Sequence, residues 1–330
     1  MAARILLPGL LLLIFSCESS LKREFNHAMS TNDTRSAKES AERTLRANPN
    51  DPEANYLMGK VLAIERNYPE AKDYFGRSME AAPVYREQID HILERSYRSE
   101  FNAATAARRK QQYETAISFY QTALQIYPDN PDPYPLIGES YKKLGQYEQA
   151  QEAFQKCQPV QRFRRLCGTN LAISYFKNQQ FEQAKIVSMQ HLENYPRDRN
   201  LLKVAAYAHL ENGDIEIADS IFSRYIDSGF TYDALKQFAT ELNNAGEIYR
   251  AESYYTLCLR FYPSDKEVLS ALSSIYLETG NYHLMVQANE RLLSLEPENT
   301  AHKERLMLAY ELVGDIDNLR VMQYELGIME

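Results

Sequence analysis

Apolar residues recur at helical spacing along most of the chain, and short breaks divide them into pairs of helices. The stretch 134–154 shows this pattern most clearly, because two amphipathic helices of about twelve residues can be drawn through it, with Gly145 between them. Glycine ends a helix there at no steric cost, because it adopts the left-handed conformation. Each helix carries one small residue, Gly138 or Ala150, and Phe154 stands beside them. The pattern predicts a hairpin whose two backbones approach closely.

The hairpin pattern returns with a period of 34 residues. One hairpin leaves an apolar face uncovered, so neighbours at a fixed period are expected. The small position of the second helix recurs at Ala116, Ala150, Ala184 and Ala218, and after a one-residue slip at Ala251, Met285 and Leu319. The glycine between the helices recurs as Gly213, Gly246, Gly280 and Gly314. Proline closes the second helix at Pro49, Pro83, Pro128, Pro196, Pro263 and Pro297.

The spacing Tyr134-x2-Ile137-Gly138-x2-Tyr141, followed by Ala150-x3-Phe154, resembles the tetratricopeptide repeat (TPR) signature, with Tyr where Trp usually stands. The resemblance covers essentially everything after residue 17. It implies an all-α fold, an α-solenoid of about eight to nine helix-turn-helix repeats that form a right-handed superhelix. In a solenoid each repeat contacts only its neighbours, so a chain of 330 residues need not divide into separate globular domains.

The register of the repeats predicts the organisation of the chain. Residues 17–51 are expected to form a tether and a degenerate N-terminal repeat, 52–85 a clear repeat, 97–299 six contiguous repeats and 300–330 a capping repeat. Residues 86–96 are a helical insertion, with Ile89, Ile92 and Leu93 at helical spacing. This insertion either lengthens the helix that follows or adds a separate turn.

The first residues have the composition of a targeting segment. Arg4 precedes an apolar run, 5–15, which is too short to cross a bilayer as a helix. This is typical of a secretory signal peptide, predicted over 1–16, and an N-terminal anchor helix is the alternative. Ser16-Cys17 resembles the processing site of bacterial lipoproteins. That resemblance implies lipidation of Cys17, a lipid anchor on the inner or outer membrane, and a periplasm-facing position in the bacterial cell envelope.

Charge and motifs argue against several classes of function. The chain has a net charge of −8, and residues 199–330 carry 11 Lys and Arg against 21 Asp and Glu, which disfavours nucleic acid as a partner. The sequence lacks the common hydrolase, phosphate-binding and metal-ligand motifs, so we expect no enzyme activity, no cofactor and no metal site. His191 and His209 fall on packing positions of their repeats, and we expect them to be buried and structural.

The cysteines beyond the leader have two interpretations. Cys157 and Cys258 occupy the same repeat position, which is typical of a small core residue. Cys167 follows Cys157 by ten residues, across a turn. In an oxidising compartment these two could form a disulfide if their α-carbons lie within about 7 Å, and the sequence leaves this open.

The TPR resemblance implies a concave groove lined by the first helices, with the side chains at positions five, nine, twelve and thirteen of each repeat facing it. The groove residues predicted from this register are Phe101, Arg108, Arg109, Lys142, Lys143, Ile173, Phe176, Lys177 and Tyr207. They suggest a cationic stripe beside aromatic side chains, suited to an acidic or carboxylate-ended peptide. The alternative is that these Lys and Arg residues are solvated charges at helix C-termini. A second basic patch, 161–165, is either solvated or meets anionic lipid or a partner.

These features together favour a non-enzymatic scaffold or adaptor lipoprotein of the cell envelope, for instance one that helps to assemble an envelope machine. Its partner would be a protein or peptide held in the concave groove. The alternative is an accessory subunit that recruits polysaccharide- or peptidoglycan-processing enzymes, in which Tyr56, Tyr207 and Phe101 would stack on sugar rings. The oligomeric state is not determined by the sequence.

Overall fold

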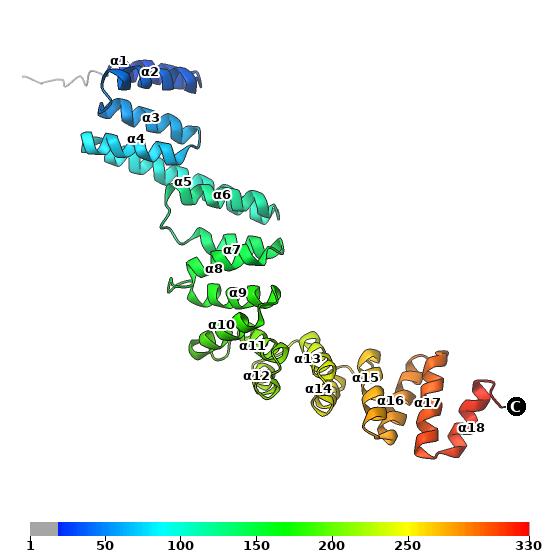
Figure 1. Cartoon of the computed structure of the whole chain (residues 1–330). Coiled ribbons are helices and arrows are strands. Elements are labelled where there is room, and N and C mark those ends of the chain that lie inside the picture. The colour runs from blue at the N-terminus through cyan, green and yellow to red at the C-terminus, as the bar shows by residue number, and fades with distance from the viewer. Residues whose placement is uncertain (1–18, 330) are drawn as a thin grey trace, which may run out of the picture. The chain divides into compact units, whose positions relative to one another are not determined.

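The computed structural model describes residues 19–329, and every regular element within them is helical (Figure 1). The helices up to residue 160 are α1 (Ser20–Ser30), α2 (Thr34–Ala47), α3 (Pro52–Ile64), α4 (Tyr68–Ala81), the 3-10 helix η1 (Pro83–Tyr85), α5 (Arg86–Arg109), α6 (Tyr113–Ile126), α7 (Pro133–Lys143) and α8 (Tyr147–Cys157). Those after it are α9 (Arg164–Lys177), α10 (Phe181–Asn194), α11 (Arg199–Glu211), α12 (Ile215–Asp227), α13 (Tyr232–Asn244), α14 (Ile248–Phe261), α15 (Lys266–Glu278), α16 (Tyr282–Leu295), α17 (Thr300–Val313) and α18 (Ile316–Glu325).

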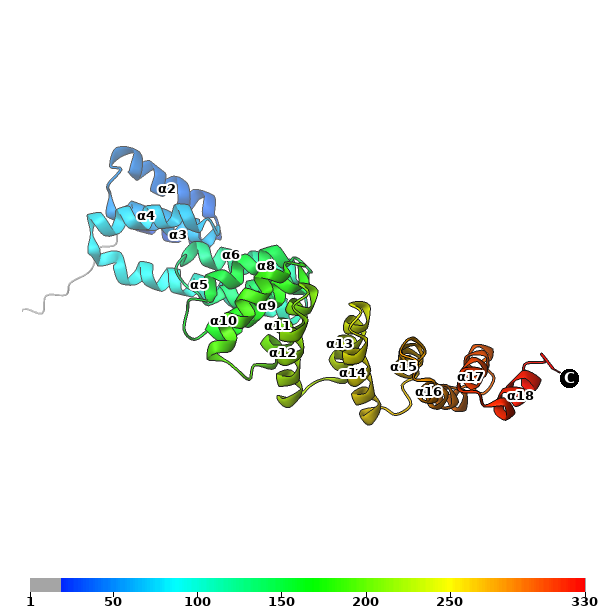
Figure 2. The same cartoon turned by 60° about the horizontal axis from the view of Figure 1, so that its bottom comes forward.

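The helices pair in chain order as antiparallel hairpins, from α1 with α2 to α17 with α18 (Figures 1 and 2). They belong to two compact units, which divide between Val160 and Gln161. In each unit a hairpin packs on the next hairpin, for example α2 on α3 and α16 on α17. The described residues therefore form an all-α repeat solenoid, which confirms the predicted fold class.

Close approach within each hairpin depends on the small residues that the sequence pattern identified. Gly138 in α7 faces the ring of Phe154 in α8, and a Cβ at position 138 would lie only 2.6 Å from that ring. Gly59 faces Phe75 in the same way, with a corresponding distance of 2.5 Å. Ala150 is fully buried beside Phe154. The glycine thus leaves the space that the aromatic ring of the second helix occupies, as predicted.

The turn inside each hairpin needs one residue in the left-handed conformation. Gly145 has a φ of 74°, which a residue with a side chain adopts only with strain. In other hairpins the same conformation is taken by non-glycine residues, Asn32, Arg66, Gln111 and Gln179, with φ between 57° and 64°. The turn geometry therefore persists where the glycine signal is absent.

The segment predicted as an insertion belongs to one long helix. Residues 86–109 form α5 without interruption, so the extra residues lengthen the first helix of their hairpin. The first half of α5 buries Ile89 and Leu93 against α3 and α4, whereas the second half buries Ala104 and Ala107 against α6. The helix therefore contributes to two successive clusters of the core.

Candidate functional site

The first helices α9, α11 and α13 of the second unit form one continuous face. The central helix α11 contacts both α9 and α13. Nine of its thirteen residues are buried, which places α11 in the middle of the packing and fixes its position. Four of the nine predicted groove residues lie here, namely Ile173, Phe176 and Lys177 on α9 and Tyr207 on α11.

A pocket of about 150 Å³ opens on this face, which we call the apolar pocket. It is lined by Ile173, Phe176, Lys177, Asn200, Lys203, Val204, Tyr207 and Gln237. An apolar cavity of roughly 150 Å³ is large enough for a benzene ring, whereas pockets for drug-sized ligands usually reach about 300 Å³ or more. The apolar pocket therefore has room for one large apolar side chain.

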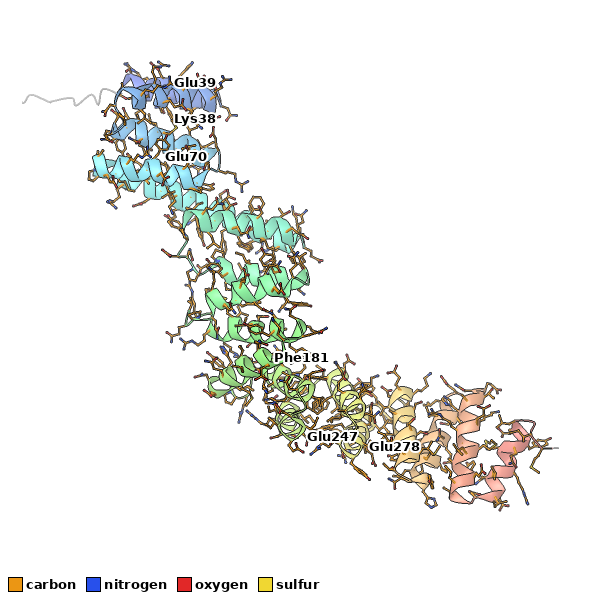
Figure 3. The ribbon with its side chains drawn as sticks, in the orientation of Figure 1. Lys38, Glu39, Glu70, Phe181, Glu247 and Glu278 are labelled. Carbon is orange, nitrogen blue, oxygen red and sulfur yellow. The ribbon has the colours of Figure 1, made fainter. Side chains whose placement is uncertain are left out.

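Tyr207 forms a rigid wall of the apolar pocket. Its hydroxyl donates a hydrogen bond of 2.8 Å to the backbone carbonyl of Ala234, and its ring contacts Phe176, Phe222 and Phe238. Phe176 is supported in turn by Phe181 at the first turn of α10 (Figure 3), with 5.4 Å between ring centroids. Burial raises the pKa of Tyr207 far above its ordinary value, so this side chain stays neutral.

The charges change sign along α11. Lys177 and Lys203 lie at the apolar pocket, and neither forms an ion pair or side-chain hydrogen bond with another described residue. At the C-terminal end of α11, burial raises the pKa of Glu211, and the nearby charge of Glu241 adds to the shift. The face formed by α9, α11 and α13 thus carries lysines at the apolar pocket and a glutamate at the C-terminal end of α11.

The other predicted groove residues lie in the first unit, on α5 and α7. Phe101 packs against Tyr120, with 5.3 Å between ring centroids. Arg109 and Lys143 are exposed, and burial lowers the pKa of the half-buried Lys142.

Within the predicted cationic stripe, Arg108 is paired with an acidic residue. Its Nη1 donates a 2.9 Å hydrogen bond to the carboxylate of Glu139, which neutralises the guanidinium. The two residues belong to successive repeats, so sequence position alone did not reveal the pair.

The sequence register identified half of the apolar pocket. Ile173, Phe176, Lys177 and Tyr207 were predicted, and the structure brings all four together. Lys203 was missed although it stands at position five of its repeat, the register used for the others. The remaining residues of the lining, Asn200, Val204 and Gln237, lie outside that register and carried no sequence signal.

The aromatic residues proposed for sugar stacking offer little free ring surface. Tyr207 is only 5% exposed, which corrects the expectation that it is open to solvent. Tyr56 stacks on Tyr85 with 4.9 Å between centroids, and Phe101 packs against Tyr120. A glycan would therefore have to displace these neighbours before it could stack.

The described residues hold no cluster of His, Cys, Asp and Glu suited to a metal ion. His191 and His209 are buried, as predicted, and Nδ1 of His209 lies 3.0 Å from the carboxylate of Asp214. Cys258 is a buried free thiol. The predicted lipidation site, Cys17, lies outside the described residues.

Comparisons with protein families identify the repeats. Three family models match, one described as a TPR repeat over residues 106–145 and two described as tetratricopeptide repeats, over 22–85 and over 133–158 with 267–299. Together with the paired helices, these matches identify the chain as a tetratricopeptide repeat protein. A comparison with curated proteins finds no match.

Within residues 19–329, none of the helices has both the length and the apolar character needed to span a membrane.

Several solved structures align with this chain. The complex of Naa15/Naa10 bound to HypK-THB aligns at 16% identity and a TM-score of 0.46, over 94% of this chain and 42% of that chain. MamA from Desulfovibrio magneticus RS-1 aligns at 15% identity and a TM-score of 0.47, over 51% of this chain and 96% of that chain. PilF of Pseudomonas aeruginosa aligns at 14% identity and a TM-score of 0.45, over 64% of this chain and 97% of that chain. The chain thus spans less than half of the first of these proteins, and likeness at this level concerns the fold alone.

Proposed function

We propose that this protein is a non-enzymatic scaffold that binds a segment of a partner protein in the groove of α9, α11 and α13. The observation that carries the proposal is the apolar pocket, which is sized for one side chain and has two lysines at its rim. TPR proteins serve as protein-binding scaffolds. A partner segment would insert an aromatic or branched aliphatic residue between Ile173, Phe176 and Tyr207.

Rigid packing around the pocket supports this proposal. The ring of Tyr207 packs against the buried Phe238 and the ring of Phe176 packs against Phe181, so little ordering is needed when a ligand binds. A preformed site loses less conformational entropy on association than a flexible one, which favours useful affinity from a short segment. The first unit also carries exposed cations, Arg109 on α5 and Lys143 on α7, which could meet acidic parts of a partner.

The proposal places the scaffold at a bacterial cell envelope, anchored by lipid at Cys17. Its role there would be that of an adaptor in the assembly of an envelope machine. The support is the sequence of residues 1–17, namely a short apolar run followed by Ser16-Cys17. A role as a glycan-binding accessory subunit is less favoured, because the rings of Tyr56, Phe101 and Tyr207 are covered by neighbours.

A displayed random-peptide library tests the groove. The full-length protein in detergent should enrich peptides with one essential aromatic or aliphatic residue, and Ile173→Asp should abolish their binding. Ile186→Asp is the matched control, because Ile186 is 57% exposed on α10 and does not line the apolar pocket. If no peptide is enriched, or if Ile173→Asp binds the enriched peptides as well as the control does, the proposed groove function is wrong.

Mass spectrometry of the protein expressed in a bacterium with a lipoprotein pathway tests the anchor. The expected species begins at Cys17 and carries acyl chains. An unmodified chain that keeps residues 1–16 would contradict lipidation and leave the groove proposal untouched.

A further inference from the structure

A second pocket adjoins the apolar pocket at the start of α11. It measures about 420 Å³, and we call it the arginine pocket. Its lining is Arg165, Arg197, Asp198, Arg199, Asn200, Lys203, Tyr225 and Thr231. Four of these eight residues are cationic and one is acidic, although the chain as a whole has a net charge of −8. This is therefore a local concentration of positive charge on an acidic protein.

The single carboxylate of the arginine pocket is fully engaged. Oδ1 of Asp198 accepts hydrogen bonds from the backbone N–H groups of Asn200 and Leu201, at 3.1 and 3.3 Å, and so caps α11. Oδ2 of Asp198 accepts a 2.9 Å bond from Nε of Arg165. Asp198 therefore neutralises one cation, and it already occupies the amides at the helix start.

The other three cations have no partner among the residues that the structure describes. Within residues 19–329, neither Arg197, Arg199 nor Lys203 forms an ion pair or a side-chain hydrogen bond. The guanidinium of Arg199 lies beside Gly229 in the loop before α13, because a Cβ built on Gly229 would be 3.7 Å from its Cζ. An Arg guanidinium with unused N–H donors is well suited to bind a carboxylate in bidentate fashion.

The two pockets are neighbours on α11, because Asn200 and Lys203 line both of them. A segment whose apolar side chain fills the apolar pocket therefore places its adjacent residues near the arginine pocket. The same ligand would meet an apolar environment first and a cationic one next. The opposite end of α11 carries Glu211, whose negative charge would repel the acidic part of such a ligand.

We propose that the arginine pocket binds the carboxylates of an acidic stretch that directly adjoins the apolar anchor residue in the same partner segment. This inference rests on the proposed groove function and adds to it the composition of the partner: one large apolar residue next to Asp or Glu residues. Arg197, Arg199 and Lys203 receive the carboxylates, while Arg165 is held by Asp198.

A protein segment fits this surface better than a membrane or a nucleic acid. Both of those are extended polyanions, and the many acidic residues that follow position 199 would repel them. A short acidic segment meets only the local charge. The adjoining pocket for a single side chain also matches a peptide, in which an apolar residue and a carboxylate can be immediate neighbours.

Fluorescence anisotropy with labelled synthetic peptides tests the inference on the full-length protein in detergent. The probes are a peptide with one Phe followed by glutamates, its sequence reversal, and the same peptide with serines in place of the glutamates. The variant is Arg197→Glu with Arg199→Glu, and Arg197→Gln with Arg199→Gln provides a milder pair. The control is Arg305→Glu with Arg320→Glu, which makes the same change in net charge at exposed positions of α17 and α18.

Of the glutamate peptide and its reversal, the one that binds the control protein more tightly is used for the comparison. We expect this peptide to bind the Arg197/Arg199 charge-reversal variant about tenfold more weakly than it binds the control, with a smaller difference at high salt. The serine peptide should bind both proteins equally. Equal binding of the glutamate peptide to variant and control overturns the inference. In this assay the groove function itself fails if Ile173→Asp leaves the binding of both peptides unchanged, a result that the arginine substitutions do not affect. Binding to phosphatidylserine vesicles is measured as well. If the charge-reversal variant loses vesicle binding but binds the glutamate and serine peptides as the control does, the arginine pocket is a lipid site and the inference is overturned.

Discussion

The guanidinium of Arg66 donates two hydrogen bonds to the carboxylate of Glu100, which lies 34 residues further along the chain. This separation equals the repeat period. Arg66 stands at the turn between α3 and α4, and Glu100 is buried on α5, where the hydroxyl of Tyr68 also donates to it at 3.0 Å. Arg165 and Asp198, 33 residues apart, make a comparable link in the second unit. Polar bonds between successive repeats therefore supplement the apolar packing.

Replacing Glu100 with Gln should destabilise the first unit. The variant weakens two charge-assisted bonds and the bond from Tyr68, so the loss should be about 1–3 kcal/mol, towards the lower end because Arg66 is half exposed. Urea unfolding followed by circular dichroism measures it. Glu94→Gln is the control, because Glu94 is exposed on the same helix and pairs with Arg98 on the surface, where a loss below about 0.5 kcal/mol is expected. Equal effects of the two variants would contradict the role of Glu100.

Adding a methyl group should have opposite effects at two helical glycines. Gly138→Ala places a Cβ against Phe154 and should cost about 1–3 kcal/mol of unfolding free energy. Gly76→Ala on α4 meets no atom within 4 Å and should stabilise by about 0.5–1 kcal/mol, because alanine is the better helix former. Thermal unfolding of both variants gives the comparison. If Gly138→Ala leaves the free energy of unfolding unchanged, α7 and α8 separate more easily than their packing indicates.

Acid should weaken the second unit through Glu296. Hydrogen bonds from Lys266, Asn299 and His302 lower the pKa of Glu296 from 4.5 to about 2. Since the folded-state pKa is below the unfolded value, the stabilisation is present above about pH 4.5 and is lost as the pH falls towards 2. Thermal midpoints of wild type and Glu296→Gln should therefore converge across this window. Glu298→Gln, a change at an exposed neighbour, is the control, and its thermal midpoint should fall with acid as the wild-type midpoint does. The prediction fails if the midpoint of Glu296→Gln falls by the same amount.

The thiol of Cys258 should be unreactive in the folded protein. Burial raises its pKa to about 12, so the thiolate fraction at neutral pH should be at least about a hundredfold lower than for an exposed cysteine. Iodoacetamide labelling followed by mass spectrometry of the tryptic peptide 251–260 measures this. We expect slow labelling of native protein and complete labelling in denaturant. Rapid native labelling would show that α14 opens locally.

The residues that form hairpins could be read from the sequence because they act over short distances. Gly138, Ala150 and Phe154 are all within one hairpin, and their spacing alone places a gap opposite a ring. The turn was less readable, because Arg66, Asn32 and Gln111 take the left-handed conformation without a glycine to signal it. The helical spacing around Ile89 could also be read from the sequence. Whether that segment joined the following helix depended on the packing of its two halves against two core clusters.

The sequence by itself determined the repeat period, the helix pairs and the register of buried positions, because each follows from spacing inside a single repeat. Tertiary structure alone decided how charges meet, since ion pairs and pockets draw residues from repeats about 30 or more positions apart. It paired Arg108 with Glu139, and it gathered Arg165, Arg197 and Lys203 around one pocket. Long charged side chains can reach several neighbours, so their partners depend on the way that successive repeats stack.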